Sequence, residues 1–224
     1  MTRGLTFGEI AERGGVCAQA SRVTRDVVVR SNAAAADDAR VHLYVISCDT
    51  CAVTKACCSY VVSAYLYEAI PIAARLVREG RNTPALRKQL RDAAERMESV
   101  GPLGHVGPCV FLDAAERCSI YEDRPSVCGT HLVSSPAEHC ANVGGDVTAI
   151  AAPLQESLPP ETAVAIAEDL GLEPIDTQYF GVMPRMVWLC LEAWPRTDYV
   201  KFLARHGRAA AARVAKLAPP VTSP

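Results

Sequence analysis

The feature that most constrains this chain is the placement of its cysteines. Ten cysteines occur among 224 residues, and eight of them lie between Cys48 and Cys140. Residues 1–10 contain one arginine and no apolar stretch of the kind found in a secretion signal. In a chain without an export signal, clustered thiols are typical of metal binding or catalysis, not of disulfide bonds. The sequence therefore predicts a metal site in the middle of the chain.

Composition argues against several other classes of protein. The formal net charge is −2, so a nucleic-acid binder driven by bulk positive charge is not expected. The chain has no run of about 18 apolar residues that could span a membrane. Half of its residues are hydrophobic, and 224 residues can bury a core without disulfide bonds. We therefore expect a cytoplasmic globular protein with no nucleic-acid or membrane partner.

The hydrophobic pattern predicts helices on both sides of the cysteine-rich segment. Apolar residues are dense over 61–77, which indicates a largely buried helix that Pro71 starts or kinks. Thr83 and Pro84 are typical of a helix N-cap and first position, and apolar residues then recur at three- and four-residue steps up to Val100. Three more helices are expected at 160–170, 184–194 and 197–217.

Shorter elements are predicted elsewhere. Residues 1–39 show no clean period, and the alternation over 41–46 favours a short strand or an extended segment that leads toward the first cysteines. Two β-type runs begin at Cys109 and Cys118 and are separated by a polar turn at 114–117. This pattern predicts a short hairpin with a cysteine at the start of each arm.

Four of the clustered thiols lie in one short segment. Cys48 and Cys51 form a Cys-x2-Cys pair, a spacing that lets two thiolates bind one metal from a single tight turn. Cys57 and Cys58 follow at the predicted entry to a helix, where the helix N-terminus stabilises thiolates. Adjacent side chains point in different directions, so one of these two could bind the metal while the other packs, reacts or binds a second metal.

Three further thiols lie in a second segment, the last of them on a turn or short helix that begins near Pro125. Together the two segments supply more thiols than one tetrahedral zinc ion needs, and enough for an iron–sulfur cubane or for two metals that share ligands. Soft thiolate ligands favour zinc or iron–sulfur over magnesium, calcium or manganese, but the spacing does not choose between iron and zinc. The predicted metal-binding residues are Cys48, Cys51, Cys57, Cys58, Cys109, Cys118 and Cys128.

The second segment resembles a known family. Its string Pro-Cys-x-Phe-Leu, followed by Cys-x-Ile-Tyr-Glu-x-Arg-Pro-x-x-Cys, runs from Pro108 to Cys128. With the Cys-x2-Cys and Cys-Cys pairs upstream, residues 48–131 are similar to the YkgJ-type cysteine-cluster family. That family is described as a zinc- or iron-chelating domain, and the flagellin lysine-N-methylase is among its relatives. The resemblance implies iron–sulfur binding in the methylase-like members, with zinc as the alternative, and specifies no substrate.

The chain departs from the family pattern in two places. Five residues, 52–56, separate Cys51 from the Cys-Cys pair, where the family usually has two. Gly129 follows the last cysteine, where the family usually has an arginine. The first difference bears on which thiols bind the metal, and the second on the edge of the site.

Other residues of metal-binding types are expected to be structural. Cys190 lies in an apolar run and, like the isolated Cys17, is expected to be a core residue. Cys140, His131 and His139 could complete a metal site, but lone residues of these types more often have structural roles.

Polar residues near the second segment and at the C-terminus are also expected to be structural. Tyr121, Glu122, Arg124 and Pro125 are interpreted as supports, with the arginine pairing with an acid or donating to sulfur and the proline fixing a turn. The basic face of the helix predicted at 197–217 is interpreted as solvated surface, with docking of an acidic partner as the alternative.

These observations predict an α+β fold that is mostly helical, with a cysteine-rich metal-binding core and a short β-hairpin flanked by helices. We expect an N-terminal segment at 1–40, a cysteine-cluster metal-binding domain at 41–140, and a C-terminal helical region at 141–224 packed on it.

Two functions fit the sequence. The first is an iron–sulfur protein, holding a [4Fe–4S] cluster that supports a methyltransferase-like or redox modification of a peptide, a protein or a small molecule. The second is a zinc-binding structural or adaptor module without catalytic activity. No glycine-rich nucleotide fingerprint and no Cys-x3-Cys-x2-Cys radical signature occurs in the chain.

Overall fold

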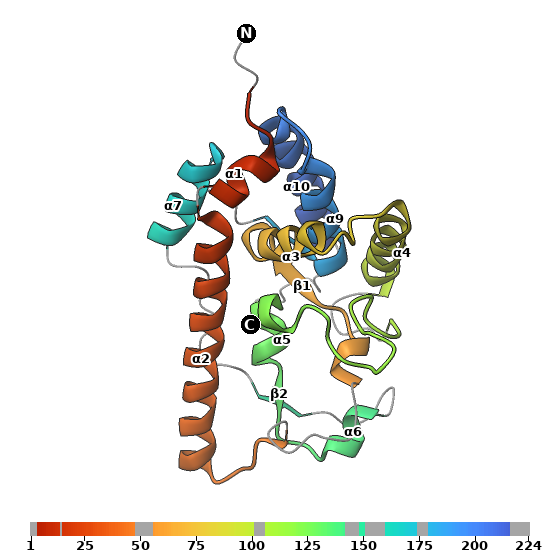
Figure 1. Ribbon diagram of the computed structural model, residues 1–224. Coiled ribbons are helices and arrows are strands. Elements are labelled where there is room, and N and C mark those ends of the chain that lie inside the picture. Colours follow the sequence, from red (N-terminus) through yellow and green to blue (C-terminus); the bar gives the residue numbers. More distant parts are fainter. Residues whose placement is uncertain are drawn as a thin grey trace.

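The computed structural model describes residues 4–13, 15–47, 56–100, 106–141, 148–150, 160–173 and 179–215. Most of these residues are helical (Figure 1). The α-helices are α1 (Phe7–Arg13), α2 (Val16–His42), α3 (Leu66–Arg78), α4 (Pro84–Val100), α5 (Ser126–Thr130), α6 (Ala137–Ala141), α7 (Pro160–Leu170), α9 (Met183–Ala193) and α10 (Tyr199–Ala215). Two 3-10 turns are η2 (Ala56–Ser59) and η3 (Tyr121–Asp123). The predicted mostly helical α+β class is confirmed.

Short antiparallel strand pairs complete the fold. β1 (Ser63–Tyr65) pairs with β4 (Phe180–Val182), and β2 (Leu132–Val133) pairs with β3 (Ala149–Ile150). β1 leads directly into α3 and β4 leads directly into α9, so the first pair sets these two helices side by side. The rings of Tyr65 and Phe180, which are register partners, lie 5.0 Å apart.

Helix α3 lies at the centre of the hydrophobic core. Every residue from Leu66 to Ala74 is buried, because α2 covers one side of the helix and α9 covers another. α9 in turn contacts α4 and α10. The predicted buried helix at 61–77 is thus confirmed in its main part, but it begins at Leu66 and Pro71 lies inside it.

Helix α2 is the longest helix, and the sequence did not indicate it. Its buried stripe recurs at three- and four-residue steps, but small and polar residues form most of it, so the hydrophobic contrast is weak: Val16, Ala20, Thr24, Val27, Ser31, Ala35 and Ala39. Neither α2 nor another helix within the described ranges is long and apolar enough to cross a membrane.

Of the two alternatives predicted at 41–46, the short strand is wrong. α2 continues to His42, and Leu43 ends it in the left-handed conformation with φ of 58°. The N–H of Tyr44 donates to the Ala39 carbonyl at 3.2 Å, which closes the last turn. Leu43 is 91% exposed, so the alternating apolar residues in this stretch do not mark a buried face.

The helices predicted from Thr83 onward are confirmed within a few residues. Thr83 Oγ1 accepts a hydrogen bond from the Leu86 N–H at 3.2 Å, which is the N-cap bond of α4. α7, α9 and α10 correspond to the three predicted C-terminal helices, and the end of the last prediction, 216–217, lies outside the described residues.

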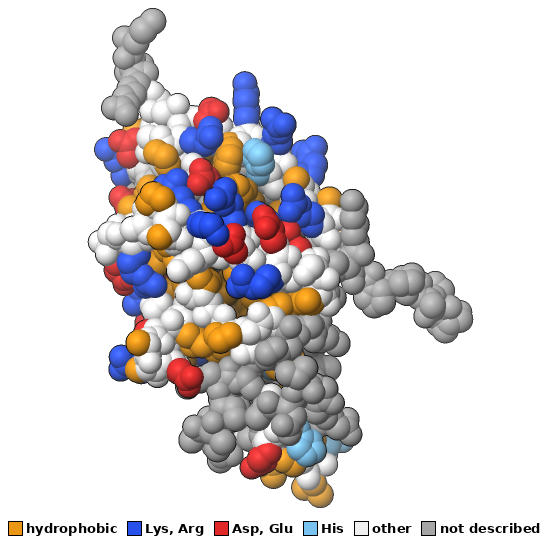
Figure 2. Space-filling model, turned by 90° about the vertical axis from the view of Figure 1, so that its right-hand side faces the viewer, with side chains coloured by type: hydrophobic (Ala, Val, Ile, Leu, Met, Phe, Trp, Pro, Cys, Tyr) orange, Lys and Arg blue, Asp and Glu red, His pale blue; other side chains and the backbone are white. Residues whose placement is uncertain are grey.

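Basic side chains are exposed along α10. Figure 2 shows Lys and Arg side chains gathered in the upper part of the face of the molecule that it draws, with acidic side chains among them. Lys201 and Arg205 are exposed. Arg208 donates to the Tyr179 hydroxyl at 3.3 Å, and Arg213 bonds to α4. Part of the basic face therefore fastens α10 to neighbouring elements.

A carboxylate on α4 joins three helices. Glu98, whose side chain is 10% exposed, accepts two hydrogen bonds of 3.0 Å from Arg185 on α9 and one of 2.9 Å from Arg213 on α10. Burial raises the pKa of Glu98, but the hydrogen bonds and charges of the two arginines outweigh it, and the net shift is downward. The ionised form of Glu98 is therefore the one that stabilises the fold.

We expect Glu98→Gln to destabilise the protein by about 3 kcal/mol, because it leaves buried arginine charge without its partner. The loss should be full at neutral pH. It should shrink as the pH falls below the ordinary pKa of a glutamate and through the lowered pKa of Glu98, because the wild-type carboxyl then becomes protonated as well. Urea unfolding at a series of pH values measures this difference. Glu95→Gln, on the exposed side of the same helix, is the control, and an equal loss in both variants would contradict the assignment.

Candidate metal centre

Five of the predicted thiols lie near one another, carried by three parts of the chain. Two are on η2, two on the loop that follows α4, and one on α5. Each of them interacts electrostatically with at least two others of the set. We call this set the thiol cluster: Cys57, Cys58, Cys109, Cys118 and Cys128. It joins one pair of the first predicted segment to all three cysteines of the second.

Burial and mutual repulsion favour the neutral form of three members of the thiol cluster, Cys58, Cys109 and Cys128. A hydrogen bond with Cys57, followed by burial and the charges of neighbouring thiols, raises the pKa of Cys58. Burial is the main cause that raises the pKa of Cys109 and of Cys128. A bound metal cation reverses this balance, because it supplies the positive charge that several adjacent thiolates need. The donor set therefore fits a thiophilic metal.

The first predicted pair, Cys48 and Cys51, lies outside the described residues. Among the residues that the structure describes, no group of three or more His, Cys, Asp or Glu side chains is placed so that it could hold a metal ion. The five thiols are thus neighbours without converging on one point, and the seven-cysteine ligand set stays a prediction.

The loop that carries Cys109 and Cys118 is a tight turn. One antiparallel bridge joins Leu112 to Cys118, and the carboxylate of Asp113 accepts the N–H groups of Ala115 and Arg117 at 2.8 and 2.9 Å. The predicted hairpin is therefore present as a turn closed by a single bridge, without extended strands.

Two apolar residues fasten this turn to the core. Phe111 and Ile120 are buried, and the Ser119 N–H donates to the Phe111 carbonyl at 2.8 Å. Cys109 and Cys118 pack against the same core beside them. The apolar positions of the Pro-Cys-x-Phe-Leu and Cys-x-Ile motifs thus anchor the two cysteines.

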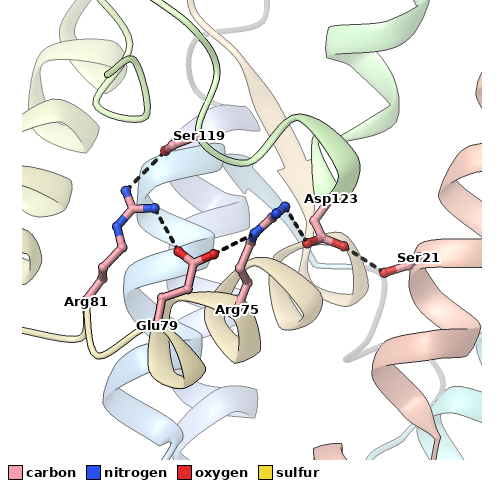
Figure 3. A network of polar contacts seen from close by, with 6 residues as sticks. All are labelled: Ser21, Arg75, Glu79, Arg81, Ser119 and Asp123. Atoms are coloured by element: carbon pink, nitrogen blue, oxygen red, sulfur yellow. Dashed lines mark hydrogen bonds and ion pairs between the residues drawn. The ribbon is translucent and has the colours of Figure 1, made fainter. Parts of the chain in front are cut away.

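A charged network attaches the segment between Cys118 and Cys128 to the helices (Figure 3). Asp123 accepts hydrogen bonds from Arg75 on α3 at 3.2 Å and from Ser21 on α2 at 3.1 Å. Arg81 donates to Ser119 at 3.1 Å, and Glu79 bridges the two arginines. Both ends of the segment are therefore held by side chains about 40 to 100 residues away in sequence.

Helix α5 carries Cys128 and packs closely against α2. A Cβ atom at Gly129 would lie 2.7 and 2.8 Å from the two methyl groups of Val28. These distances are too short for any side chain at position 129. The departure from the family pattern, glycine in place of arginine, thus has a structural reason, since α2 occupies the space beside α5.

The isolated cysteines lie where the sequence predicted. Cys190 is fully buried in α9, and Cys17 is partly buried against the same core. Cys140 and His139 are on α6, which packs against η2 and thus lies beside the thiol cluster. The N–H of His131 donates to the Val127 carbonyl at 3.1 Å at the end of α5. The roles of these last three residues as metal ligands stay untested.

The predicted supports of the second segment have distinct positions. The guanidinium carbon of Arg124 lies 4.2 Å from the centre of the Tyr121 ring, a cation–π contact, and its charge opposes the rise in the pKa of Cys128. Pro125 is buried and directly precedes α5. Tyr121 is 56% exposed. The position of Pro125 agrees with its interpretation as the residue that fixes the turn, whereas the pairing of Arg124 with an acid or its donation to sulfur stays a prediction.

Sequence reasoning missed one residue of the site. Glu68 lies on the first turn of α3, is 1% exposed, and accepts the N–H of Ser126, the first residue of α5, at 2.8 Å. Burial raises the pKa of Glu68, and hydrogen bonds from Ser126 and Tyr65 oppose this rise. A glutamate inside a dense apolar run was the available signal, because a charged residue is seldom fully buried without a partner.

We expect Gly129→Ala to displace α5, with a cost of about 1–3 kcal/mol from overpacking, and to lower metal content without changing any cysteine. The added methyl would overlap the Val28 side chain. Val28→Ala in the same protein should restore both properties, because it removes the overlapping methyl groups. Thermal unfolding and metal analysis of the two single variants and the double variant measure this. Equal effects of Gly129→Ala with and without Val28→Ala would contradict the close approach.

Comparison with known families identifies the segment that contains these residues. Residues 47–144 match the family CxxCxxCC, described as a "Putative zinc- or iron-chelating domain". All seven predicted metal-binding cysteines fall within the match. Neither a curated protein nor a solved structure matches the chain. The resemblance drawn from the cysteine motifs is therefore confirmed over residues 47–144, which are similar to this family of zinc- or iron-chelating domains.

Proposed function

We propose that this domain binds an iron–sulfur cluster of the [4Fe–4S] type. The observation that carries the proposal is the number of thiols that lie near one another. The thiol cluster contributes five, and Cys48 and Cys51 lie in the same matched segment. A tetrahedral zinc ion and a cubane each use four thiolates, so the seven cysteines suffice for a cubane with spare thiols or for two metals that share ligands.

The charges around the thiol cluster also fit such a group. Four thiolates around an oxidised cubane leave a net charge of about −2, as they do around zinc. The pKa of Cys128 is raised, mainly by burial, and the positive charge of Arg124 opposes this rise. The chemistry that a bound cluster supplies is one-electron transfer. The residues of this chain would contribute the thiolates, the burial and the charge balance.

In this proposal the cluster supports the modification of a peptide, a protein or a small molecule, of a methyltransferase-like or redox kind. The motif resemblance to relatives of the flagellin lysine-N-methylase supports an enzymatic role. The alternative is a structural zinc site. It is favoured by the packing of Cys109 and Cys118 against the core, because a metal held there would stabilise the fold directly.

Anaerobic purification should yield a brown protein that contains iron and acid-labile sulfide and that bleaches in air. Oxygen oxidises and breaks down an iron–sulfur cluster that solvent can reach, and Cys57, one of its predicted ligands, is exposed. Iron, sulfide and zinc analysis together with the visible spectrum measures this. A colourless protein with stoichiometric zinc and no labile sulfide would overturn the iron–sulfur proposal and establish the zinc alternative.

Single replacement of Cys109, Cys118 or Cys128 by alanine should abolish metal binding, because each removes a thiolate from the thiol cluster. Cys17→Ala and Cys190→Ala are the matched controls, since Cys190 is fully buried in the core and Cys17 packs against it. These two variants should keep full metal content and lose only some stability. Metal per polypeptide is the measurement, and full metal content in Cys118→Ala would refute the predicted ligand set.

A further inference from the structure

A buried carboxylate connects the central helix to the segment that carries Cys128. Oε2 of Glu68 accepts the N–H of Tyr65 at 2.9 Å, and Oε1 accepts the N–H of Ser126 at 2.8 Å. The Ser126 side chain also hydrogen-bonds to Glu68. Since both oxygens accept hydrogen bonds from backbone N–H groups, the ionised form fits this arrangement.

The first of these bonds is an ordinary helix cap, and the second is not. A glutamate at the third position of a helix commonly accepts the N–H of the N-cap residue, which here is Tyr65. This function needs one oxygen and tolerates exposure to water. The other oxygen of Glu68 reaches a residue 58 positions away and accepts an N–H that α5 cannot use internally.

That second bond bears directly on Cys128. α5 has only five residues, and Cys128 is the third of them. A helix this short has little stability of its own, so its position depends on what holds its ends. Figure 1 shows α5 below α3 and next to β1. Glu68 therefore fixes the N-terminal end of α5 two residues before the thiol.

The charge of Glu68 also acts on the same cysteine. Its negative charge is among the causes that raise the pKa of Cys128, and Arg124 acts in the opposite direction. In a buried site a fixed charge is weakly screened. A metal centre that uses the Cys128 thiolate would thus experience one fixed negative charge from α3 and one positive charge from Arg124.

We propose that Glu68 is a positioning residue of the metal centre, which orients Cys128 through the N-terminus of α5 and adds a fixed negative charge beside it. The inference rests on the proposed function in one respect, that Cys128 binds the metal. A glutamate that only capped α3 would affect stability alone. A positioning residue also changes how tightly the metal is held and, for an iron–sulfur cluster, the reduction potential.

Two variants separate the effect of the Glu68 charge from the effect of its hydrogen bonds to Ser126. Glu68→Gln keeps the size of the side chain but removes the charge and replaces one acceptor oxygen by a donor NH2 group. Ser126→Pro removes the N–H and the hydroxyl that bond to Glu68 but leaves the charge. Proline suits the first position of a helix, and Pro125 already has the extended ψ of 153° that the residue before a proline adopts.

Glu98→Gln is the matched control. It also removes a carboxylate that is mostly buried, but that carboxylate bonds to Arg185 and Arg213 and has no part in the thiol cluster. All variants are prepared as full chains. Each is loaded either with Zn²⁺ alone or with iron and sulfide under anaerobic conditions, and a chelator competes for the metal.

Both Glu68→Gln and Ser126→Pro should weaken zinc binding about 10- to 100-fold. Glu98→Gln should bind the metal as the wild type does, although it unfolds more readily. In the iron–sulfur form, Glu68→Gln should raise the reduction potential, because a nearby negative charge disfavours addition of an electron. Ser126→Pro, which keeps that charge, should not show this rise.

The outcomes distinguish a failure of the positioning role of Glu68 from a failure of the proposed function. Wild-type metal affinity in Glu68→Gln, or equal weakening in Glu98→Gln, would overturn the positioning role while the proposed function stands. An unchanged potential in iron-loaded Glu68→Gln would likewise overturn the role of its charge. A wild-type protein that holds neither zinc nor iron would overturn the proposed function, and the positioning role with it.

Discussion

The arrangement of this domain depends on the burial of α3. An unbroken run of buried residues from Leu66 to Ala74 leaves no solvated side on the first part of the helix. Any polar group there must find a protein partner, because burial without one is costly. Glu68 finds its partners in Tyr65 and Ser126. At the other end of the helix, Arg75 reaches Asp123. Polar groups of α3 thus attach the segment between Cys118 and Cys128 to this helix.

Helix α2 also holds the segment around Cys128, from a different side than α3 does. It covers α3 and α5, donates from Ser21 to Asp123, and approaches Gly129 so closely that no side chain fits there. These contacts involve residues on either side of Cys128. The position of Cys128 is therefore shared between α3 and α2, and a change in either helix would reach the thiol through packing and not through the chain.

The sequence predicts those parts of the fold that local pattern encodes. α4, α9 and α10 have apolar faces and recognisable starts, so their positions follow from spacing and capping. α2 escaped prediction because alanine, threonine and serine form much of its buried stripe, and these residues give little contrast with a solvated face. The alternation at 41–46 misled because periodicity reports which side chains are apolar, not which are buried. Leu43 is exposed in spite of it.

The candidate metal centre also has a part that the sequence predicts and a part that it does not. The thiols were identified because cysteine is rare and its spacing has a chemical meaning within a few residues. The partners of Glu68, Arg75 and Arg81 could not be identified, because these contacts join residues far apart in the chain. Nothing near Glu68 in the sequence indicates Ser126 as its partner. A motif thus names the ligands of a metal site, whereas the residues that orient them become visible only when the fold is known.

The contact between Gly129 and Val28 has a consequence for the family as a whole. A relative with a large side chain after its last cysteine cannot place an N-terminal helix at the distance that α2 keeps here. Glycine at that position therefore serves as a marker. Among sequences that share the cysteine motifs, it should separate those whose N-terminal region wraps around the last cysteine from those in which that side is open. In the open group, an arginine would occupy the space that α2 fills here.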